Sequence, residues 1–269
     1  MTSIVIFDSG VGGLSVFEQV AASLPKADYV LVCDNLEFPY GDKSEQCLNQ
    51  RVLNVMQRIV AQFKPDLAVV ACNTASTIVL PLLRESFHIP IVGVVPAVKP
   101  ASERSLSREF GLLATPATVA RSYTQNLLNQ FASDCTVMKV GSSRLVEIAE
   151  TKLYGGTVDM QALEAELRPF LQNPNCDVLV LACTHFPLLN KEISSIFEDN
   201  NHAIELIDSG SSIARRVVQL LHHQKMPNVT ISSHAQFAKA VFTAPVDGQL
   251  AFIRTLQEYG LEYAGSLND

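Results

Sequence analysis

A pattern that occurs twice limits the possible folds of this chain more than any other feature. Asp66-Leu-Ala-Val-Val-Ala-Cys72-Asn-Thr74 returns 111 positions later as Asp177-Val-Leu-Val-Leu-Ala-Cys183-Thr-His185. In both copies an aspartate precedes five apolar residues, and a cysteine with two hydrogen-bonding followers stands at their end. Such apolar runs are typical of strands buried on both faces. Because ligands of open α/β sheets bind beyond the carboxyl ends of strands, the repeat predicts two similar halves, each with a cysteine at a ligand-binding edge.

Short β-branched runs alternate with longer stretches of helical periodicity, which indicates an α/β fold with mainly parallel sheets. The clearest helix is expected from Cys47 to Phe63, ended by Lys64-Pro65. Together with the repeat, this predicts two doubly wound domains related by pseudo-two-fold symmetry, with the site in the cleft between them. Eight strands are expected, at Ile4–Phe7, Tyr29–Cys33, Leu67–Ala71, Ile91–Val95, Phe110–Ala114, Thr136–Val140, Val178–Ala182 and Ile204–Ile207.

The chain is expected to cross from one half to the other and then to return. Proline ends strands and fixes linker geometry, so the stretch from Val94 to Pro100 is a candidate crossing. A return is expected near Glu205–Asp208. The first domain would comprise residues 1–96 and 207–269, and the second would comprise residues 97–206.

The composition excludes several classes of protein. Hydrophobic residues make up 48% of the chain and charged residues 17%, so a large core can form without disulfides. The six cysteines include no CxxC pair, and we expect no signal peptide and no membrane span, which favours a soluble protein of the reducing cytoplasm. A net charge of −7 with dispersed Lys and Arg argues against nucleic acid as a primary partner.

Cys72 and Cys183 are the strongest candidates for chemistry, because passive packing does not require matching strand ends with polar followers. Two thiols on opposite walls of one cleft could remove a proton from one face of a chiral carbon and return one on the other. To hold one thiol as a thiolate at pH 7, its pKa must fall by about 1.5 units, which corresponds to ~2 kcal/mol of stabilisation. Helix N-termini and hydrogen-bond donors can supply this. Since free cysteines are usually buried, the other four are interpreted as packing residues: Cys33, Cys47, Cys135 and Cys176.

Two further residues, His185 and Asp8, are candidates for the chemistry. His185 could share in proton transfer or bind a carboxylate, and since no Cys or His spacing completes four ligands, we expect no metal. Asp8 begins the glycine-rich turn 8–13 and could bind an ammonium group, help to activate Cys72, or cap the following helix. This turn has neither GxGxxG nor P-loop spacing, so no dinucleotide is expected. Glu150, on its own pattern, is expected to be solvated.

Four motifs occur in order along nearly the whole chain: Asp8-Ser-Gly-Val-Gly-Gly13, Asp34-Asn…Pro39-Tyr40-Gly41, Cys72-Asn-Thr-Ala-Ser76 and Cys183-Thr-His-Phe-Pro-Leu-Leu189. Together they resemble the motif set of the bacterial glutamate racemase family, within the aspartate/glutamate racemase superfamily.

This resemblance implies roles for individual residues. Cys72 and Cys183 would transfer the protons, one acting on each enantiomer, while Asp8 and His185 would assist the nearer cysteine. Glu150 is implied as a further assisting acid. Substrate contacts are implied from Asp8, Ser9, Tyr40, Gly41, Asn73, Thr74, Thr184 and His185, with Thr115 and Thr118 as additional candidates.

The activity implied is interconversion of L- and D-glutamate without pyridoxal phosphate or any other cofactor, by a homodimer that would supply D-glutamate to peptidoglycan. No lysine lies in a motif where a Schiff base could form, and Lys43 and Lys191 are expected at the surface. One alternative is an aspartate racemase or a related decarboxylase, although the presence of both cysteines favours racemisation. The alternative from another class is a thiol-lined binding module without turnover.

Overall fold

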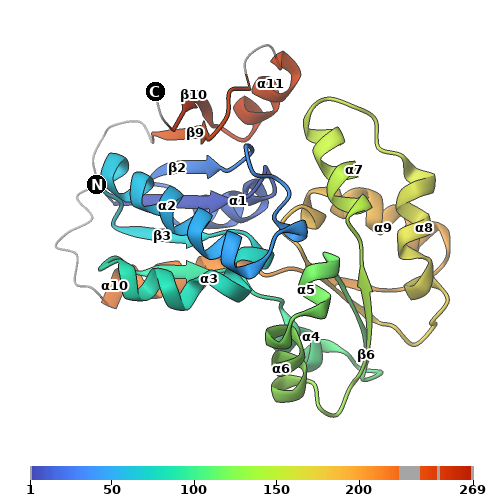
Figure 1. Cartoon of the computed structure of the whole chain (residues 1–269). Coiled ribbons are helices and arrows are strands. Elements are labelled where there is room, and N and C mark those ends of the chain that lie inside the picture. Colours follow the sequence, from blue (N-terminus) through green and yellow to red (C-terminus); the bar gives the residue numbers. More distant parts are fainter. Residues whose placement is uncertain (1, 224–236, 247–248, 268–269) are drawn as a thin grey trace.

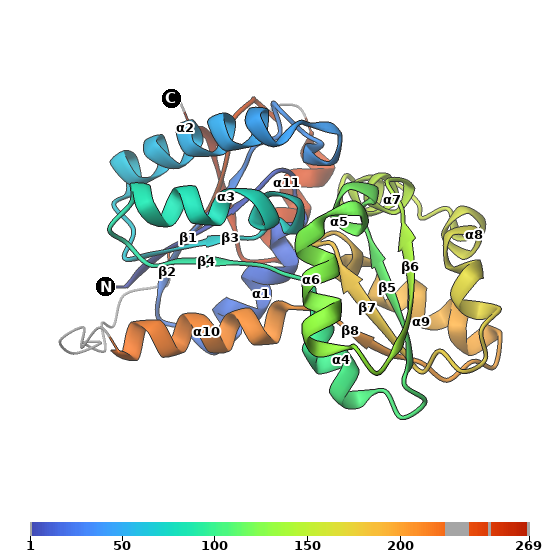
Figure 2. The same ribbon diagram turned by 60° about the horizontal axis from the view of Figure 1, so that its bottom comes forward.

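The computed structural model describes residues 2–223, 237–246 and 249–267. Two sheets, each with only parallel pairs between its strands, form two halves that lie side by side (Figures 1 and 2). The first sheet contains β1 (Ser3–Asp8), β2 (Asp28–Cys33), β3 (Leu67–Val70), β4 (Ile91–Gly93), β9 (Ala238–Phe242) and β10 (Glu262–Ser266). The second contains β5 (Glu109–Ala114), β6 (Thr136–Gly141), β7 (Val178–Ala182) and β8 (Glu205–Ile207).

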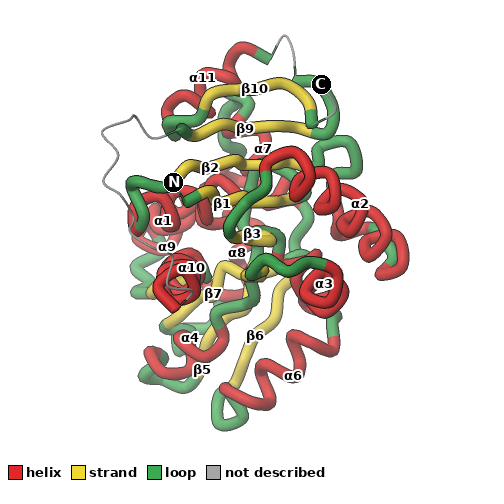
Figure 3. The backbone as a smooth tube through the Cα atoms, turned by 90° about the vertical axis from the view of Figure 1, so that its left-hand side faces the viewer, coloured by secondary structure: helices red, strands yellow, loops and turns green. Residues whose placement is uncertain are grey.

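The two sheets repeat one strand order. The first runs β10-β9-β2-β1-β3-β4, as the tube in Figure 3 displays for its upper strands, and the second runs β6-β5-β7-β8. The four strands β2-β1-β3-β4 of the first sheet therefore have the same order as the four strands β6-β5-β7-β8 of the second. The internal sequence repeat is therefore a repeat of a four-stranded unit, in which β3 and β7 hold equivalent places.

Helices cover both faces of the first sheet. On one face α1 (Gly13–Ser23), α10 (Gly210–His223) and α11 (Leu250–Glu258) share a core with β1 and β2. On the other face lie α2 (Glu45–Phe63) and α3 (Asn73–Ser86).

The helix expected from Cys47 to Phe63 is confirmed as α2. The Ser44 hydroxyl caps it by accepting from the Cys47 N–H, and Lys64 ends it in a left-handed conformation with φ 45°.

The second sheet is covered in the same way. Its two faces pack against α7 (Arg144–Leu153), α8 (Met160–Leu171) and α9 (Asn190–Asp199) on one side, and α4 (Val98–Arg104) and α6 (Ser122–Phe131) on the other. Short helical turns complete the carboxyl edges of the two sheets: η1 (Tyr40–Asp42), α5 (Pro116–Ala120) and η2 (Phe186–Leu189).

The expected α/β class and all eight expected strands are confirmed, and the sequence patterns missed β9 and β10. β9 contains a lysine between alanines and β10 contains a glycine, so neither has a continuous apolar run. Of the expected crossing, only residues 94–97 lie outside regular structure, because α4 already begins at Val98. We propose to keep the division into residues 1–96 plus 207–269 and residues 97–206, although the return falls within β8, whose last residue Ile207 still pairs with Val180 of β7.

Within the described ranges, no helix is both long and apolar enough to cross a membrane.

Candidate functional site

Parallel pairing brings the candidate residues together at the carboxyl edges of the two sheets. β1 pairs with β3, which places Asp8 near Cys72, and β5 pairs with β7, which places Thr115 near Cys183. Both edges open on one cavity of about 200 Å³ that both cysteines line. Its lining residues are Ser9, Phe38, Pro39, Tyr40, Gly41, Asp42, Cys72, Asn73, Thr74, Thr115, Ser143, Val146, Glu147, Cys183, Thr184 and His185.

Cys72 lies at the N-terminus of α3 and is 5% exposed. Its Sγ is 3.5 Å from the Ser9 hydroxyl. Burial raises the pKa of the Cys72 thiol, and the negative charge of Asp8 raises it further. The Ala75 N–H and the Ser9 hydroxyl act in the opposite direction, but they do not outweigh burial. This environment favours the neutral thiol.

Cys183 has a different neighbour. Its Sγ lies 3.8 Å from Nδ1 of His185, whose Nε2 lies 2.7 Å from a Glu150 carboxylate oxygen. Burial alone would lower the pKa of His185, but its interactions with Cys183 and Glu150 raise that pKa well above the usual value. The ring is therefore an imidazolium at neutral pH, and it places a positive charge beside the Cys183 sulfur.

Glu150 is thus not the solvated residue that its own sequence pattern predicts, and that expectation was wrong. Its side chain is 17% exposed, pairs with His185, and accepts a hydrogen bond from the Val11 N–H at 3.2 Å. The resemblance had marked this glutamate, but local periodicity could not. The pairing needs α7 to pack against the glycine-rich turn after β1.

Hydrogen bonds join the two halves beside the cavity. The Thr184 hydroxyl donates to Asp8 Oδ2 at 3.0 Å, and the Ser15 hydroxyl donates to the Thr184 carbonyl at 2.8 Å. Gly12 allows this close approach, because a Cβ there would lie 2.5 Å from His185 Nδ1. The glycine-rich turn therefore serves contact between the halves.

Asp8 is fully buried and lies behind the cavity wall. Burial raises its pKa to about 6, against the lowering effects of the His185 charge, the Ser9 N–H and the Thr184 hydroxyl. The capping role considered for Asp8 does not occur, since α1 begins after Gly12 with no side-chain cap.

Most residues implied as substrate contacts line the cavity. Asn73 is 4% exposed, and its Oδ1 has no hydrogen-bond partner within the described part of the chain. The Thr74 hydroxyl lies 3.2 Å from that of Thr115 and 3.4 Å from that of Thr118, which stands behind the wall. The Tyr40 hydroxyl donates to Asp34 at 2.5 Å, which leaves its ring and backbone for a substrate.

Five lining residues escaped the sequence analysis because no charge pattern, motif or repeat marks them: Phe38, Asp42, Ser143, Val146 and Glu147. None of the lining residues that the structure describes is Arg or Lys. An anionic ligand would therefore be held by hydroxyl, amide and backbone N–H groups, including those at the start of α3 and α7. In the described ranges, no three His, Cys, Asp or Glu side chains cluster as metal ligands would.

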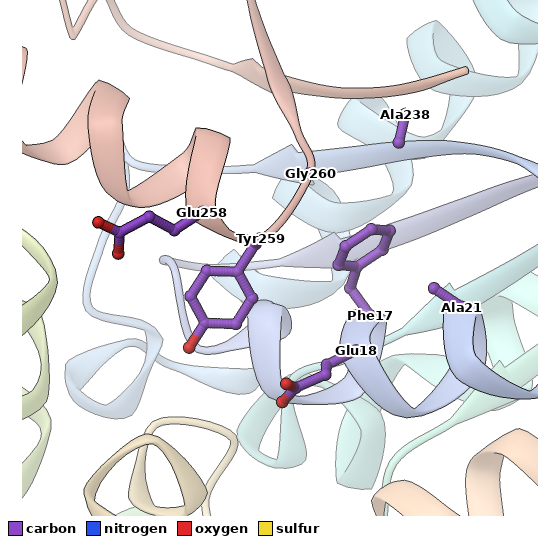
Figure 4. Close-up of a pocket in the computed structure, with 7 residues that line it drawn as sticks. All are labelled: Phe17, Glu18, Ala21, Ala238, Glu258, Tyr259 and Gly260. Atoms are coloured by element: carbon purple, nitrogen blue, oxygen red, sulfur yellow. The ribbon is translucent and has the colours of Figure 1, made fainter. Parts of the chain in front are cut away.

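A larger hollow of about 420 Å³ lies between α1 and the turn that joins α11 to β10 (Figure 4). Phe17, Glu18, Tyr259 and Gly260 are among its lining residues, and none of the candidate residues lines it. We place the chemistry in the smaller cavity because it alone of the two is lined by thiols, those of Cys72 and Cys183.

Comparison with known proteins gives a consistent result. Residues 13–217 match the family model described as Asp/Glu/Hydantoin racemase. The glutamate racemase of Salmonella typhimurium is 44% identical over 261 residues, which cover 97% of this chain and 90% of the Salmonella protein. That of Sodalis glossinidius is 44% identical over 266 residues, which cover 98% of this chain and 90% of the Sodalis protein.

Solved structures extend the similarity to three dimensions. The crystal structure of Escherichia coli glutamate racemase, in complex with L-glutamate and the activator UDP-MurNAc-ala, matches with a TM-score of 0.90 and 43% identity, covering 98% of this chain and 97% of that one. A glutamate racemase isoform from Bacillus anthracis matches with a TM-score of 0.81 and 25% identity, covering 98% and 96%. These matches confirm the α/β fold with two parallel sheets.

Proposed function

Because the chain belongs to the Asp/Glu/hydantoin racemase family, we propose that it interconverts L- and D-glutamate. The product D-glutamate would serve peptidoglycan synthesis. The observation that carries this proposal is the placement of Cys72 and Cys183 at equivalent strand ends on one small cavity. At about 200 Å³ the cavity is smaller than the roughly 300–1,000 Å³ of pockets for drug-sized ligands, which suits an amino acid.

In the proposed reaction one cysteine starts as thiolate and the other as thiol. The thiolate takes the α-proton and becomes a thiol, and the electron pair of the broken C–H bond remains on the α-carbon and its carboxylate. The second thiol then protonates the opposite face of that carbon and becomes a thiolate. Protons and charge balance over one turnover, and neither a cofactor nor an outside oxidant is needed.

The surroundings of Cys183 and Cys72 differ in charge, and those of Cys72 favour its neutral thiol. The His185 imidazolium stands beside the first sulfur, whereas burial and Asp8 raise the pKa of the second. The negative charge that develops on the substrate α-carboxylate would be stabilised by hydrogen-bond donors of the cavity, such as Asn73 and the backbone at the start of α3.

Deuterium exchange tests the proposal. The protein is incubated with L-glutamate in D₂O without added cofactor, while the α-proton signal and the optical rotation are followed. We expect loss of both, and D-glutamate should give the mirror-image result. Binding without exchange would replace the racemase by a binding module, and exchange on aspartate alone would make it an aspartate racemase.

We further propose that the protein acts in the cytoplasm as a homodimer, with the small dicarboxylic amino acid as its principal ligand. Light scattering coupled to size-exclusion chromatography measures the assembly directly. A mass near 29.4 kDa would indicate a monomer, and a mass twice as large would support the dimer.

A further inference from the structure

One wall of the cavity is a segment with almost no regular structure. Residues 38–42 line the cavity, and only η1 interrupts the loop that joins β2 to α2. Leu36, at the start of this loop, is 59% exposed. A loop of this kind needs anchors if it is to hold a cavity wall in one position.

The anchor is the carboxylate of Asp34, which is fully buried and accepts hydrogen bonds from three side chains. The Tyr40 hydroxyl donates to Oδ2 at 2.5 Å, and the Arg51 guanidinium donates from Nε to Oδ2 at 2.8 Å and from Nη2 to Oδ1 at 2.5 Å. The Thr243 hydroxyl donates to Oδ1 at 2.6 Å.

The charges of this cluster fix its protonation. Although burial acts to raise the pKa of Asp34, the hydrogen bonds from Arg51, Thr243 and Tyr40 lower it below its usual value. Burial and the Asp34 charge together raise the pKa of Tyr40, so its hydroxyl remains a donor. The cluster is therefore a carboxylate held by three permanent donors, and it takes no part in proton transfer.

One of these contacts comes from Thr243, which directly follows β9 and is far from the loop in the sequence. The Thr243 hydroxyl also accepts from the Leu36 N–H at 3.2 Å. Beside it, the Asn35 side chain donates to the Ala244 carbonyl at 3.0 Å and accepts from the Ala244 N–H at 2.9 Å. The loop is thus fastened to the C-terminal part of the chain, which contributes no lining residue of its own.

We propose that Thr243 and Arg51 are positioning residues of the proposed racemisation, which act through Asp34 to hold the 38–42 wall against the substrate. We expect the wall to affect substrate binding and not proton transfer, because both cysteines and their partners Ser9 and His185 belong to other segments. Loosening it raises the KM for both enantiomers and changes kcat much less. This inference rests on the proposed function for its kinetic part only.

The decisive variant is Thr243→Val, which keeps the shape of the side chain and removes the hydroxyl. We expect the KM for both glutamate enantiomers to rise about tenfold, equivalent to ~1.4 kcal/mol, with kcat within about twofold. Thr243→Ser restores the hydroxyl and should restore the KM. Arg51→Lys keeps the positive charge but cannot donate to both oxygens of Asp34 at once, so it should also raise the KM.

The matched control is Thr255→Val in α11, where the lost hydroxyl donates to the Leu153 carbonyl at 2.9 Å. It should leave the KM within about twofold of the original. Hydrogen exchange measured by mass spectrometry gives a readout that needs no substrate. Thr243→Val should speed exchange in residues 35–42, while the sheets keep their protection.

Unchanged exchange in residues 35–42, or faster exchange throughout the protein, would overturn the assignment. So would a fall in kcat with an unaltered KM, because that indicates loss of folded enzyme. If the original protein does not racemise glutamate, the proposed function fails, and the exchange experiment still decides whether Thr243 positions the wall.

Discussion

The two halves place Cys72 and Cys183 at equivalent strand ends, but their surroundings have opposite electrostatic character. Next to Cys72 are the neutral Ser9 hydroxyl and the carboxylate of Asp8. Next to Cys183 is the His185 imidazolium, whose charge is maintained by Glu150. A repeated fold unit can therefore place two thiols at matching positions in surroundings of different charge.

The difference arises from residues that follow each strand and from the other half of the molecule. Thr184 and His185 follow the second cysteine, whereas Asn73 and Thr74 follow the first. Asp8 receives a hydrogen bond from Thr184 across the boundary between the halves. Symmetry of the backbone therefore does not impose symmetry of the charges.

The largest effect is expected from removing either thiol. Cys72→Ser and Cys183→Ser should each lower racemisation by about 1,000-fold or more, because a serine hydroxyl is not ionised near pH 7 and cannot replace a thiolate. Fold and glutamate binding should persist, as circular dichroism and calorimetry can show. Cys47→Ser, at an exposed position in α2, is the matched control, and full activity in either active-site variant would remove the two-thiol mechanism.

A smaller effect is expected on the stability of the folded protein, through the buried carboxyl of Asp8 next to Cys72. The pKa of Asp8 is about 6 in the folded protein against 3.8 normally, so between these values the unfolded chain holds fewer protons than the folded protein. Stability therefore falls as pH rises from 3.8 to 6, by up to about 3 kcal/mol, and stays lower above pH 6. Asp8→Asn removes this penalty and should stabilise the fold at pH 8 while reducing activity.

Denaturant unfolding at several pH values measures this effect. Below about pH 3.8 the Asp8 carboxyl is neutral in both states, so the variant and the original should have similar stability there. A gain of the same size at every pH would show that packing, and not the buried charge, is responsible.

The smallest effect is a change of pH dependence on the Cys183 side. Glu150 helps to hold the pKa of His185 above its usual 6.5, so the imidazolium persists as pH rises. Glu150→Gln keeps an acceptor for the Val11 N–H but removes the charge, and the pKa of His185 should fall. The alkaline limb of the kcat/KM profile should then move down by about one pH unit.

The exposed residue Glu164 offers a control, because Glu164→Gln makes the same chemical change on the surface of α8. An unmoved alkaline limb in Glu150→Gln would mean that Glu150 does not sustain the charge of His185.

Sequence alone determined eight of the ten strands in the described ranges and the identity of the paired cysteines. The apolar runs of β1, β3, β5 and β7 are local patterns, and a residue at the end of such a run must lie at a sheet edge whatever packs around it. The resemblance added Glu150 to the candidates Asp8 and His185, and comparison with relatives confirms the family and leaves the individual roles to experiment.

Only the tertiary structure decided the partners and charges of these residues. Glu150 and His185 are 35 positions apart, Asp8 and Thr184 are 176 apart, and Asp34 and Thr243 are 209 apart. Whether a carboxylate is buried, and which donor or cation faces it, depends on the segment that packs over it. The hydrophobic periodicity of a segment shows only which face of that helix or strand is buried. It cannot reveal contacts that form when the two halves and the C-terminal strands come together.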